Sequence, residues 1–351
     1  MAKDFLELVN EKEAEACRAL ARGVIISPGA IGDCILMLPL AELMKQSLGL
    51  GSVDFIGHTD YIDFYPGRTC VGSVRSIDLI ELHRLFAETK EFKVDDRDSL
   101  IGAFAGYECI VSFMGEMDSS FESNLIFTVN CSHSAEITIL PLSPPAGFSG
   151  HISEFYIHKF VENNILPSEP IKFDFDDTLI KASQADIDCG RDLLCASGIE
   201  GGGKIVAIAP GGGGIEKCWH LDNFCAIAEA LAQKSVDVLF LLGPAEMERF
   251  DGEMRKRIQS TAKCVWGLGL TQIIQILACV DSVLGNDSGI THIAGVMGLK
   301  TLGIFGVTDP VLYKPIGAGI TQFIAEKRGF SEAETFGQNR VIEMLFGMLD
   351  N

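Results

Sequence analysis

The sequence predicts an α/β fold made of two doubly wound domains, each built on a parallel sheet. In both halves of the chain, short apolar runs of strand length alternate with amphipathic segments of helix length, which is typical of βαβ units. Several of these runs end in glycine-rich turns. The chain has 351 residues, and one hydrophobic core rarely grows beyond about 250 to 300 residues. We therefore expect two domains.

The first half opens the alternation with a strand at 23–27, a glycine turn and a helix at 33–48. Further strands are expected at 53–57 and 107–113. These runs are rich in Val and Ile, as expected of strands that are buried on both faces of a parallel sheet. An acidic, amphipathic segment at 1–22 precedes the first strand, and we expect it to form an additional helix.

The second half repeats this pattern. Its expected strands lie at 204–210, 236–243, 282–289 and 300–306, and its expected helices at 221–234, 246–260 and 271–279. A segment rich in Pro, Gly and Ser at 137–155, followed by an irregular polar stretch to about residue 203, connects the halves. We therefore assign the domains as 1–165 and 166–330, with a C-terminal helix at 331–351 that could pack back on the first domain.

Composition excludes several classes of protein. The 28 basic residues are outnumbered by 48 acidic ones, for a net charge of −20, and such an excess opposes binding to the phosphates of nucleic acids. No apolar stretch approaches the roughly 18 residues that span a bilayer, and the acidic N-terminus lacks the features of a secretory signal. The 11 cysteines form no CxxC pair, which gives no support to a structural zinc site. We expect a cytoplasmic protein with reduced cysteines that binds neither nucleic acid nor a structural zinc ion.

The first glycine turn, SPGAIGD at 27–33, follows the first expected strand. Gly29 and Gly32 allow the backbone to approach a ligand closely. Asp33 lies at the start of the following helix, where its carboxylate either caps the helix or serves as a general base at the strand ends. The sequence leaves these two alternatives open.

The second turn contains four consecutive glycines, Gly211 to Gly214, between a strand and a helix. Such turns direct amide N–H groups at a phosphate, although a four-glycine segment taken alone is more often a flexible connector. It is not a P-loop, because no Gly-Lys-Ser/Thr follows, and it is not a complete dinucleotide-binding motif, because Glu216 occupies the place of the third glycine. Lys217 supplies a cation suited to a diphosphate, and Trp219 is expected to pack under the turn.

The third turn, GNDSG at 285–289, follows a buried strand and begins a helix. The free amides at the helix start and the hydroxyl of Ser288 indicate a second phosphate site. Asp287 would repel a diphosphate, so it must cap the helix or accept hydrogen bonds from sugar hydroxyls. His292 could reach either a phosphate or only Asp287.

Two further features are less specific. Glu246 follows a strand that ends at Gly243 and could bind ribose hydroxyls, although a glutamate in the first turn of a helix is common. The acidic runs at 95–98 and 173–177 have the spacing of metal-binding carboxylates, but they lie outside the strand-end turns and are interpreted as solvated surface.

The three turns, in this order, resemble the motifs of glycosyltransferase family nine, the heptosyltransferases that build the inner core of bacterial lipopolysaccharide. The matching residues are Gly29 to Asp33 with Leu38 and Pro39; Pro210, Gly211, Lys217 and Trp219; and Gly285 to Gly289 with His292 and the segment FGVTDP at 305–310. The resemblance is strong over 204–317, good over 23–48 and faint between them.

The resemblance implies the GT-B fold, in which two Rossmann-like domains face each other, the first binding the acceptor and the second an ADP-sugar. It implies inverting transfer without a bound metal ion or other cofactor, of heptose from ADP-heptose to a lipopolysaccharide core or related bacterial glycan. Contact with the cytoplasmic face of the inner membrane is expected to be peripheral at most. The site residues expected are Asp33 as general base; Lys217, Gly212, Gly213, Ser288 and Gly289 for the donor diphosphate; Glu246, Asp287 and His292 for the nucleoside and sugar; and Ala30 and Gly32 for the acceptor.

Two departures from the family pattern leave the acceptor open. Ser27 stands where the family commonly has a basic residue, and the first 150 residues hold 22 acidic against 11 basic side chains, which suits a phosphorylated acceptor poorly. Two other functions are compatible with the sequence: a nucleotide-sugar epimerase on the same scaffold, and a non-catalytic protein that binds sugar nucleotides. Simple binding has no need of a base such as Asp33, which argues against the second of these.

Overall fold

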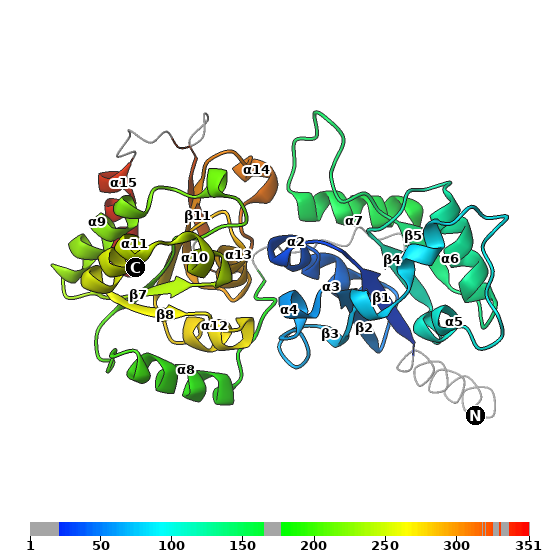
Figure 1. Cartoon of the computed structure of the whole chain (residues 1–351), viewed down its shortest axis with the longest axis horizontal. Coiled ribbons are helices and arrows are strands. Elements are labelled where there is room, and N and C mark those ends of the chain that lie inside the picture. Colours follow the sequence, from blue (N-terminus) through cyan, green and yellow to red (C-terminus); the bar gives the residue numbers. More distant parts are fainter. Residues whose placement is uncertain are drawn as a thin grey trace, which may run out of the picture. The chain divides into compact units, whose positions relative to one another are not determined.

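The computed structural model describes residues 21–164, 177–317, 319, 321–325, 330 and 337–350. The chain divides into two compact units, the first comprising 1–148 and 152–173 and the second comprising 149–151 and 174–351. Each unit is a parallel sheet flanked by helices (Figure 1), which confirms the predicted fold class. The boundary expected between residues 165 and 166, the N-terminal helix as far as residue 20, and the acidic run up to residue 176 lie outside the described residues.

The sheet of the first unit has five parallel strands in the spatial order β3-β2-β1-β4-β5. The strands are β1 (Arg22–Ile26), β2 (Ser52–Gly57), β3 (Val71–Ser76), β4 (Cys109–Ser112) and β5 (Glu136–Ile139). The strands expected from sequence correspond to β1, β2 and β4. The two that were missed lie at the edges of the sheet, where partly exposed positions interrupt the apolar run.

The helices of the first unit are α2 (Ile31–Leu36), α3 (Leu38–Ser47), α4 (Thr59–Ile62), α5 (Ser99–Phe104), α6 (Ser120–Asn130) and α7 (Ile152–Asn163), with 3-10 turns η1 (Ile77–Leu79) and η2 (Leu82–Phe86). The single helix expected over 33–48 is divided at Met37. Pro39 lies in the first turn of α3, where a missing N–H is harmless, whereas in a continuous helix its ring would meet the carbonyl of residue 35.

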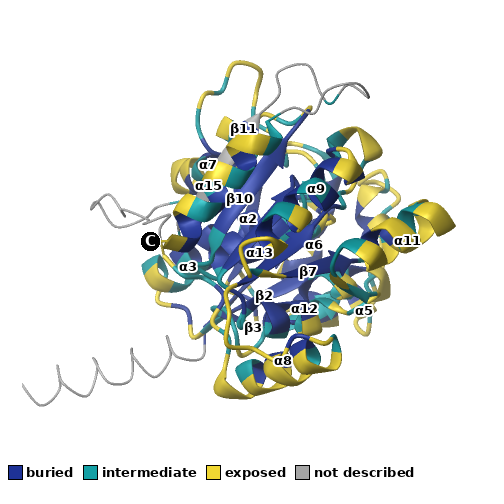
Figure 2. Cartoon of the chain, turned by 90° about the vertical axis from the view of Figure 1, so that its left-hand side faces the viewer, coloured by how far each residue is buried: buried dark blue, intermediate teal, exposed yellow. Residues whose placement is uncertain are grey.

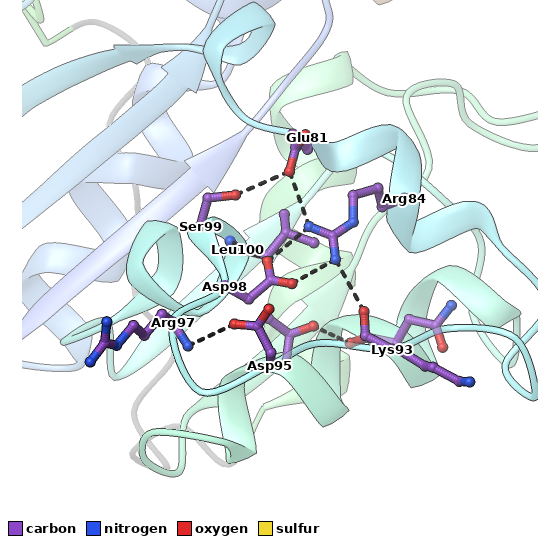
Figure 3. Close-up of polar contacts among 10 residues, drawn as sticks. Glu81, Arg84, Lys93, Asp95, Arg97, Asp98, Ser99 and Leu100 are labelled. Atoms are coloured by element: carbon purple, nitrogen blue, oxygen red, sulfur yellow. Dashed lines mark hydrogen bonds and ion pairs between the residues drawn. The ribbon is translucent and has the colours of Figure 1, made fainter.

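An arginine orders the long connection between β3 and α5 (Figure 3). Arg84 donates to both carboxylate oxygens of Asp98, at 2.8 and 2.6 Å, and also to Glu81 and to the carbonyl of Lys93. Asp98 caps α5, and the hydrogen bonds from Arg84 hold its pKa below the ordinary value. The acidic run at 95–98 is therefore not simply solvated surface, because its last carboxylate is buried and fastens the connection.

The sheet of the second unit has six parallel strands in the order β11-β10-β9-β6-β7-β8. The strands are β6 (Ile205–Ala209), β7 (Asp237–Leu242), β8 (Lys263–Trp266), β9 (Ser282–Asn286), β10 (Lys300–Phe305) and β11 (Thr321–Ala325). In both sheets the first four strands lie in the order third, second, first, fourth, which is the doubly wound arrangement. β9 ends at Asn286, so the residues from Asp287 onward lie in the turn at its carboxyl end.

The helices of the second unit are α8 (Gln184–Ala196), the 3-10 turn η3 (Ile215–Lys217), α9 (Leu221–Ala232), α10 (Pro244–Arg249), α11 (Gly252–Thr261), α12 (Leu270–Leu277), α13 (Gly289–Val296), α14 (Pro310–Tyr313) and α15 (Gln338–Asp350). The single helix expected over 246–260 is two helices, because the side chain of Asp251 accepts two backbone hydrogen bonds and caps α11. The polar stretch before residue 203, for which the sequence predicts irregular structure, contains α8. That helix buries little apolar surface, and its contact with α12 depends on Gly190, where a Cβ would lie 1.9 Å from the carbonyl oxygen of Gln275.

The last helix, α15, packs within the second unit. Its buried side chains, Val341, Leu345, Met348 and Leu349, join the core that α9 and the strands of this sheet form. The apolar face of α15 is thus used in the second unit, whereas the sequence predicts that it could pack on the first.

Figure 2 shows the strands buried and the outer helices exposed on one side. Within the described ranges, no helix combines the length and the apolar character that crossing a bilayer requires.

Candidate functional site

The turn after β1 holds Asp33 close to its own backbone. Asp33 is the third residue of α2, and its Oδ2 accepts a hydrogen bond from the N–H of Ala30 at 3.1 Å. A Cβ at Gly29 would lie 2.8 Å from the Cβ of Asp33, so this close approach requires glycine. The capping interpretation is therefore correct for one carboxylate oxygen. Oδ1 has no hydrogen-bond partner among the described residues, and the partly exposed side chain can still accept a proton.

Ala30 and Gly32, the expected acceptor contacts, flank this helix start. Ala30 is the exposed N-cap residue and Gly32 is half-buried in the first turn of α2. Behind them, the buried Ser27 accepts a hydrogen bond from the N–H of Gly29 at 3.1 Å. Ser27 therefore stabilises the conformation of the turn through this hydrogen bond.

The four glycines after β6 have ordinary backbone conformations. None of Gly211 to Gly214 has a left-handed φ, so conformational freedom is not the reason for these glycines. A Cβ at Gly211 would lie 1.8 Å from Oε1 of Glu246, so a larger residue here would displace the Glu246 carboxylate. Gly213 is exposed, and a Cβ there would meet no atom within 4 Å. At this position the backbone is open to a ligand.

Asn286 joins the glycine turn to the neighbouring strand. Its side chain is fully buried; Nδ2 donates to the carbonyl of Pro210 at 2.7 Å, and Oδ1 accepts from the N–H of Trp219 at 3.0 Å. Trp219 lies under the turn, as the sequence predicted, and packs edge-to-face on Phe224 with 5.3 Å between ring centroids. The second and third turns are thus parts of one structure.

A buried carboxylate lies at the centre of this structure. Oδ2 of Asp287 pairs with Nζ of Lys217 at 2.9 Å, and Oδ1 lies 3.5 Å from Nε2 of His292. Burial would raise the pKa of Asp287, but contacts with His292, Thr308 and Lys217 outweigh it and hold the pKa well below the ordinary value. Asp287 therefore stays ionised at neutral pH, and of the two alternatives left open for His292, the structure contains the contact with Asp287.

The start of α13 leaves several backbone donors unpaired. The hydroxyl of Ser288 lies 3.1 Å from that of Thr291, which donates to the carbonyl of Asn286 at 2.7 Å. Ser288 does not cap the helix with its side chain. The N–H groups of Gly289 and Ile290 make no hydrogen bond to the described part of the chain. The first N–H groups of an α-helix have no partner within the helix, so these two are available to an external acceptor.

Glu246 and Arg249 reach the glycine turn from α10. Oε2 of Glu246 accepts from the N–H of Gly243 at 2.7 Å and caps α10, so the ordinary interpretation of this glutamate holds for one oxygen. Arg249, at the last position of α10, donates to the carbonyls of Gly212 at 2.9 Å and Gly213 at 3.1 Å. Arg249 was not among the expected site residues.

The structure thus gathers the expected donor residues in the second unit, while Asp33, Ala30 and Gly32 form a separate group in the first. Sequence reasoning missed Arg249 and the structural roles of Asn286 and Thr291. A signal for Arg249 existed, because it follows Glu246 by three residues and side chains at this spacing share one face of a helix.

Comparison with known proteins gives a consistent result for the family. Residues 161–339 match the model of glycosyltransferase family 9 (heptosyltransferase). Over 183 residues the chain is 27% identical to lipopolysaccharide heptosyltransferase 3 of Escherichia coli strain K12, an alignment that covers 50% of this chain and 52% of that protein. Over 119 residues it is 29% identical to lipopolysaccharide core heptosyltransferase OpsX of Haemophilus influenzae, covering 32% and 33%. The matched segments thus span about half the length, or less, of these curated relatives.

Solved structures agree over nearly the whole chain. A glycosyl transferase family 9 structure from Veillonella parvula superposes with a TM-score of 0.70 at 13% identity, covering 94% of this chain and 97% of that one. The E. coli heptosyltransferase WaaC with ADP superposes with a TM-score of 0.62 at 14% identity, covering 93% and 99%. At these identities the likeness concerns the fold, which agrees with the expected GT-B arrangement of two parallel-sheet units.

Proposed function

The chain belongs to glycosyltransferase family 9, the heptosyltransferase family, and on this premise we propose that it is an inverting glycosyltransferase. In this proposal the donor is a nucleoside diphosphate sugar, with ADP-heptose as the first candidate. The acceptor is a hydroxyl of a lipopolysaccharide core or a related bacterial glycan. One observation carries the proposal: Lys217, the buried carboxylate of Asp287, the open glycine turn and the unpaired amides at the start of α13 lie together at the carboxyl edge of the second sheet.

The diphosphate is bound by Lys217 and by amides of both turns. The Lys217 side chain is about one-third exposed and its ammonium group pairs with Asp287, so it can contact a phosphate and stay near its carboxylate partner. The amides of Gly289 and Ile290 add donors at the positive end of α13. Because these groups are already oriented, they stabilise the charge that grows on the leaving diphosphate without rearranging during the reaction.

The transferred sugar lies against Asp287. Its carboxylate is ionised and held by Lys217 and His292, and each carboxylate oxygen can accept more than one hydrogen bond. A sugar hydroxyl that approaches it donates to an acceptor with a fixed position. This arrangement orients the anomeric carbon relative to the diphosphate.

The reaction is a single displacement. The acceptor oxygen attacks the anomeric carbon as the bond from that carbon to the diphosphate breaks, and attack from the opposite face inverts the configuration. The acceptor proton goes to the free Oδ1 of Asp33, whose Oδ2 remains with the N–H of Ala30. The electron pair of the broken bond stays on the diphosphate, beside Lys217.

A thermal-shift screen of ADP-, UDP-, GDP- and CMP-linked sugars tests the donor. A ligand that binds only the folded protein at a hundredfold excess over Kd adds about 2.7 kcal/mol to the free energy of unfolding. We expect the ADP-linked sugar to raise the melting temperature most. Incubation of that donor without acceptor then tests the reaction class, because an epimerase would interconvert sugars whereas a transferase at most hydrolyses them slowly. If no nucleotide sugar raises the melting temperature, the proposal fails.

Replacement of Gly213 by alanine tests where the diphosphate lies. A Cβ at Gly213 meets no atom within 4 Å in the free protein, and φ there is not left-handed. The free energy of unfolding should therefore change by less than about 1 kcal/mol. We expect ADP affinity to fall about tenfold, since the methyl group takes space that a phosphate would occupy. Titration calorimetry measures the affinity.

The matched control is Gly252→Ala at the start of α11, where a Cβ also meets no atom within 4 Å. This variant should bind ADP like the wild type. Unchanged ADP affinity in Gly213→Ala would mean that the diphosphate does not approach this glycine.

A further inference from the structure

Arg249 makes an unusual contact with the glycine turn. Its two Nη atoms donate to two consecutive backbone carbonyls, those of Gly212 at 2.9 Å and Gly213 at 3.1 Å. The planar guanidinium suits such a forked contact, because its two Nη atoms hold their N–H donors in a fixed arrangement that a lysine ammonium lacks. The contact joins residues 37 and 36 positions apart in the sequence, so it fixes the turn to α10.

The contact determines which way the turn's amides point. In a trans peptide the C=O of one residue and the N–H of the next point in opposite directions. Because the carbonyls of Gly212 and Gly213 both point to Arg249, the N–H groups of Gly213 and Gly214 point away from it. Neither N–H makes a hydrogen bond to the described part of the chain. Two adjacent amide donors are thus presented together, on the side of the turn that Arg249 does not cover.

The same helix holds the turn at a second point. Glu246, one helical turn before Arg249, lies against Gly211 and caps α10 through the N–H of Gly243. A short helix therefore contacts the turn at Gly211, Gly212 and Gly213. On the other side, Gly212 lies close to the turn after β9, since a Cβ there would be 3.6 Å from the carbonyl oxygen of Asp287.

From these contacts we propose that Arg249 is a positioning residue for donor binding. It holds the glycine turn with the amides of Gly213 and Gly214 directed at the donor diphosphate. This inference rests on the proposed function, in which that turn binds the diphosphate. The turn is ordered before the donor arrives, so donor binding does not have to supply the free energy of ordering it.

The test compares Arg249→Ala and Arg249→Lys with the wild type. Amide hydrogen exchange is followed at Lys217 and Cys218, whose N–H groups donate to the carbonyls of Gly214 and Ile215 just after the glycines. In Arg249→Ala we expect their protection to fall without ADP and to return at saturating ADP. We expect the KM for the donor to rise about tenfold and kcat to change less than about twofold, since only binding is affected once the donor orders the turn.

The lysine variant separates position from charge. Arg249→Lys keeps the positive charge but replaces the planar pair of Nη donors with one ammonium on a flexible stem, so it should hold the turn less firmly and resemble Arg249→Ala. Arg257→Ala is the control, because Arg257 is also an arginine of the second unit but pairs with Glu229 at 2.9 Å, away from the turn. This variant should behave like the wild type in every measurement.

Two results would overturn the role of Arg249. One is wild-type KM in Arg249→Lys, which would mean that charge alone matters. The other is unchanged protection of Lys217 and Cys218 in Arg249→Ala. Failure of the wild-type protein to bind ADP would count against the proposed function itself, and so is distinguishable from both.

Discussion

Replacement of Asp33 by asparagine is expected to lower kcat for sugar transfer about 10³-fold, within the range that general base catalysis contributes, and to leave ADP affinity unchanged. Asparagine can still accept the hydrogen bond from Ala30 that caps α2, so the helix start should persist. It cannot accept the proton of the acceptor. Single-turnover kinetics with bound donor measure the effect on the chemical step.

A second variant of Asp33 shows what its capping role contributes, and a variant of Asp60 serves as the control. Asp33→Ala removes the base and the cap together, and should also lower the free energy of unfolding by about 1 kcal/mol. Asp60→Asn changes a carboxylate in α4, which follows β2 at the same edge of the sheet, and should retain wild-type turnover. Full turnover in Asp33→Asn would remove Asp33 from the role of base.

Replacement of Lys217 by alanine is expected to weaken the binding of ADP and of the donor roughly 10- to 100-fold, because a hydrogen bond to a charged group contributes about 1.5 to 3 kcal/mol. The cation that neutralises the diphosphate is lost. Asp287 also loses its partner at 2.9 Å, and its uncompensated charge then repels the ligand. Titration calorimetry with ADP gives the affinity without requiring an acceptor.

The chain contains a matched ion pair for comparison. Lys204 pairs with Asp281 at 2.9 Å and joins β6 to β9 at the opposite end of the same two strands. Lys204→Ala should lower the free energy of unfolding by about as much as Lys217→Ala does, and it should leave ADP affinity unchanged. If Lys217→Ala also leaves ADP affinity unchanged, then Lys217 serves only to neutralise Asp287.

The central strands could be predicted because their signal is local. Every residue of β6 and β9 is buried. β6 is an uninterrupted apolar run and β9 has an apolar centre at Val283 and Leu284, and each strand is followed by a glycine-containing turn. The edge strands β3 and β8 are partly exposed and include polar residues, so neither the apolar run nor strict alternation marks them. Helix ends were less predictable, because Met37 and Asp251 interrupt patterns that read as continuous.

Prediction of the site was limited in the same way. The residues on the glycine turns could be found, since glycine and capping chemistry at a strand end is legible within a few residues. The partners of these residues could not be found from sequence, because the contacts depend on which strands are neighbours in the sheet. Asn286 contacts a carbonyl 76 residues away, and Lys217 pairs with Asp287 at a separation of 70. The order of β6 beside β9 brings these groups together.

The shared strand order of the two sheets makes the turns after β1 and β6 topologically equivalent, since each follows the first strand of its unit. In the proposed reaction these equivalent positions receive different products of a single event. Transfer releases one proton from the acceptor and adds one negative charge to the departing diphosphate. The turn after β1 takes the proton on Asp33, and the turn after β6 takes the charge beside Lys217. The same kind of strand-end turn thus occurs once in each unit, and in the proposed reaction one turn accepts the proton while the other stabilises the negative charge.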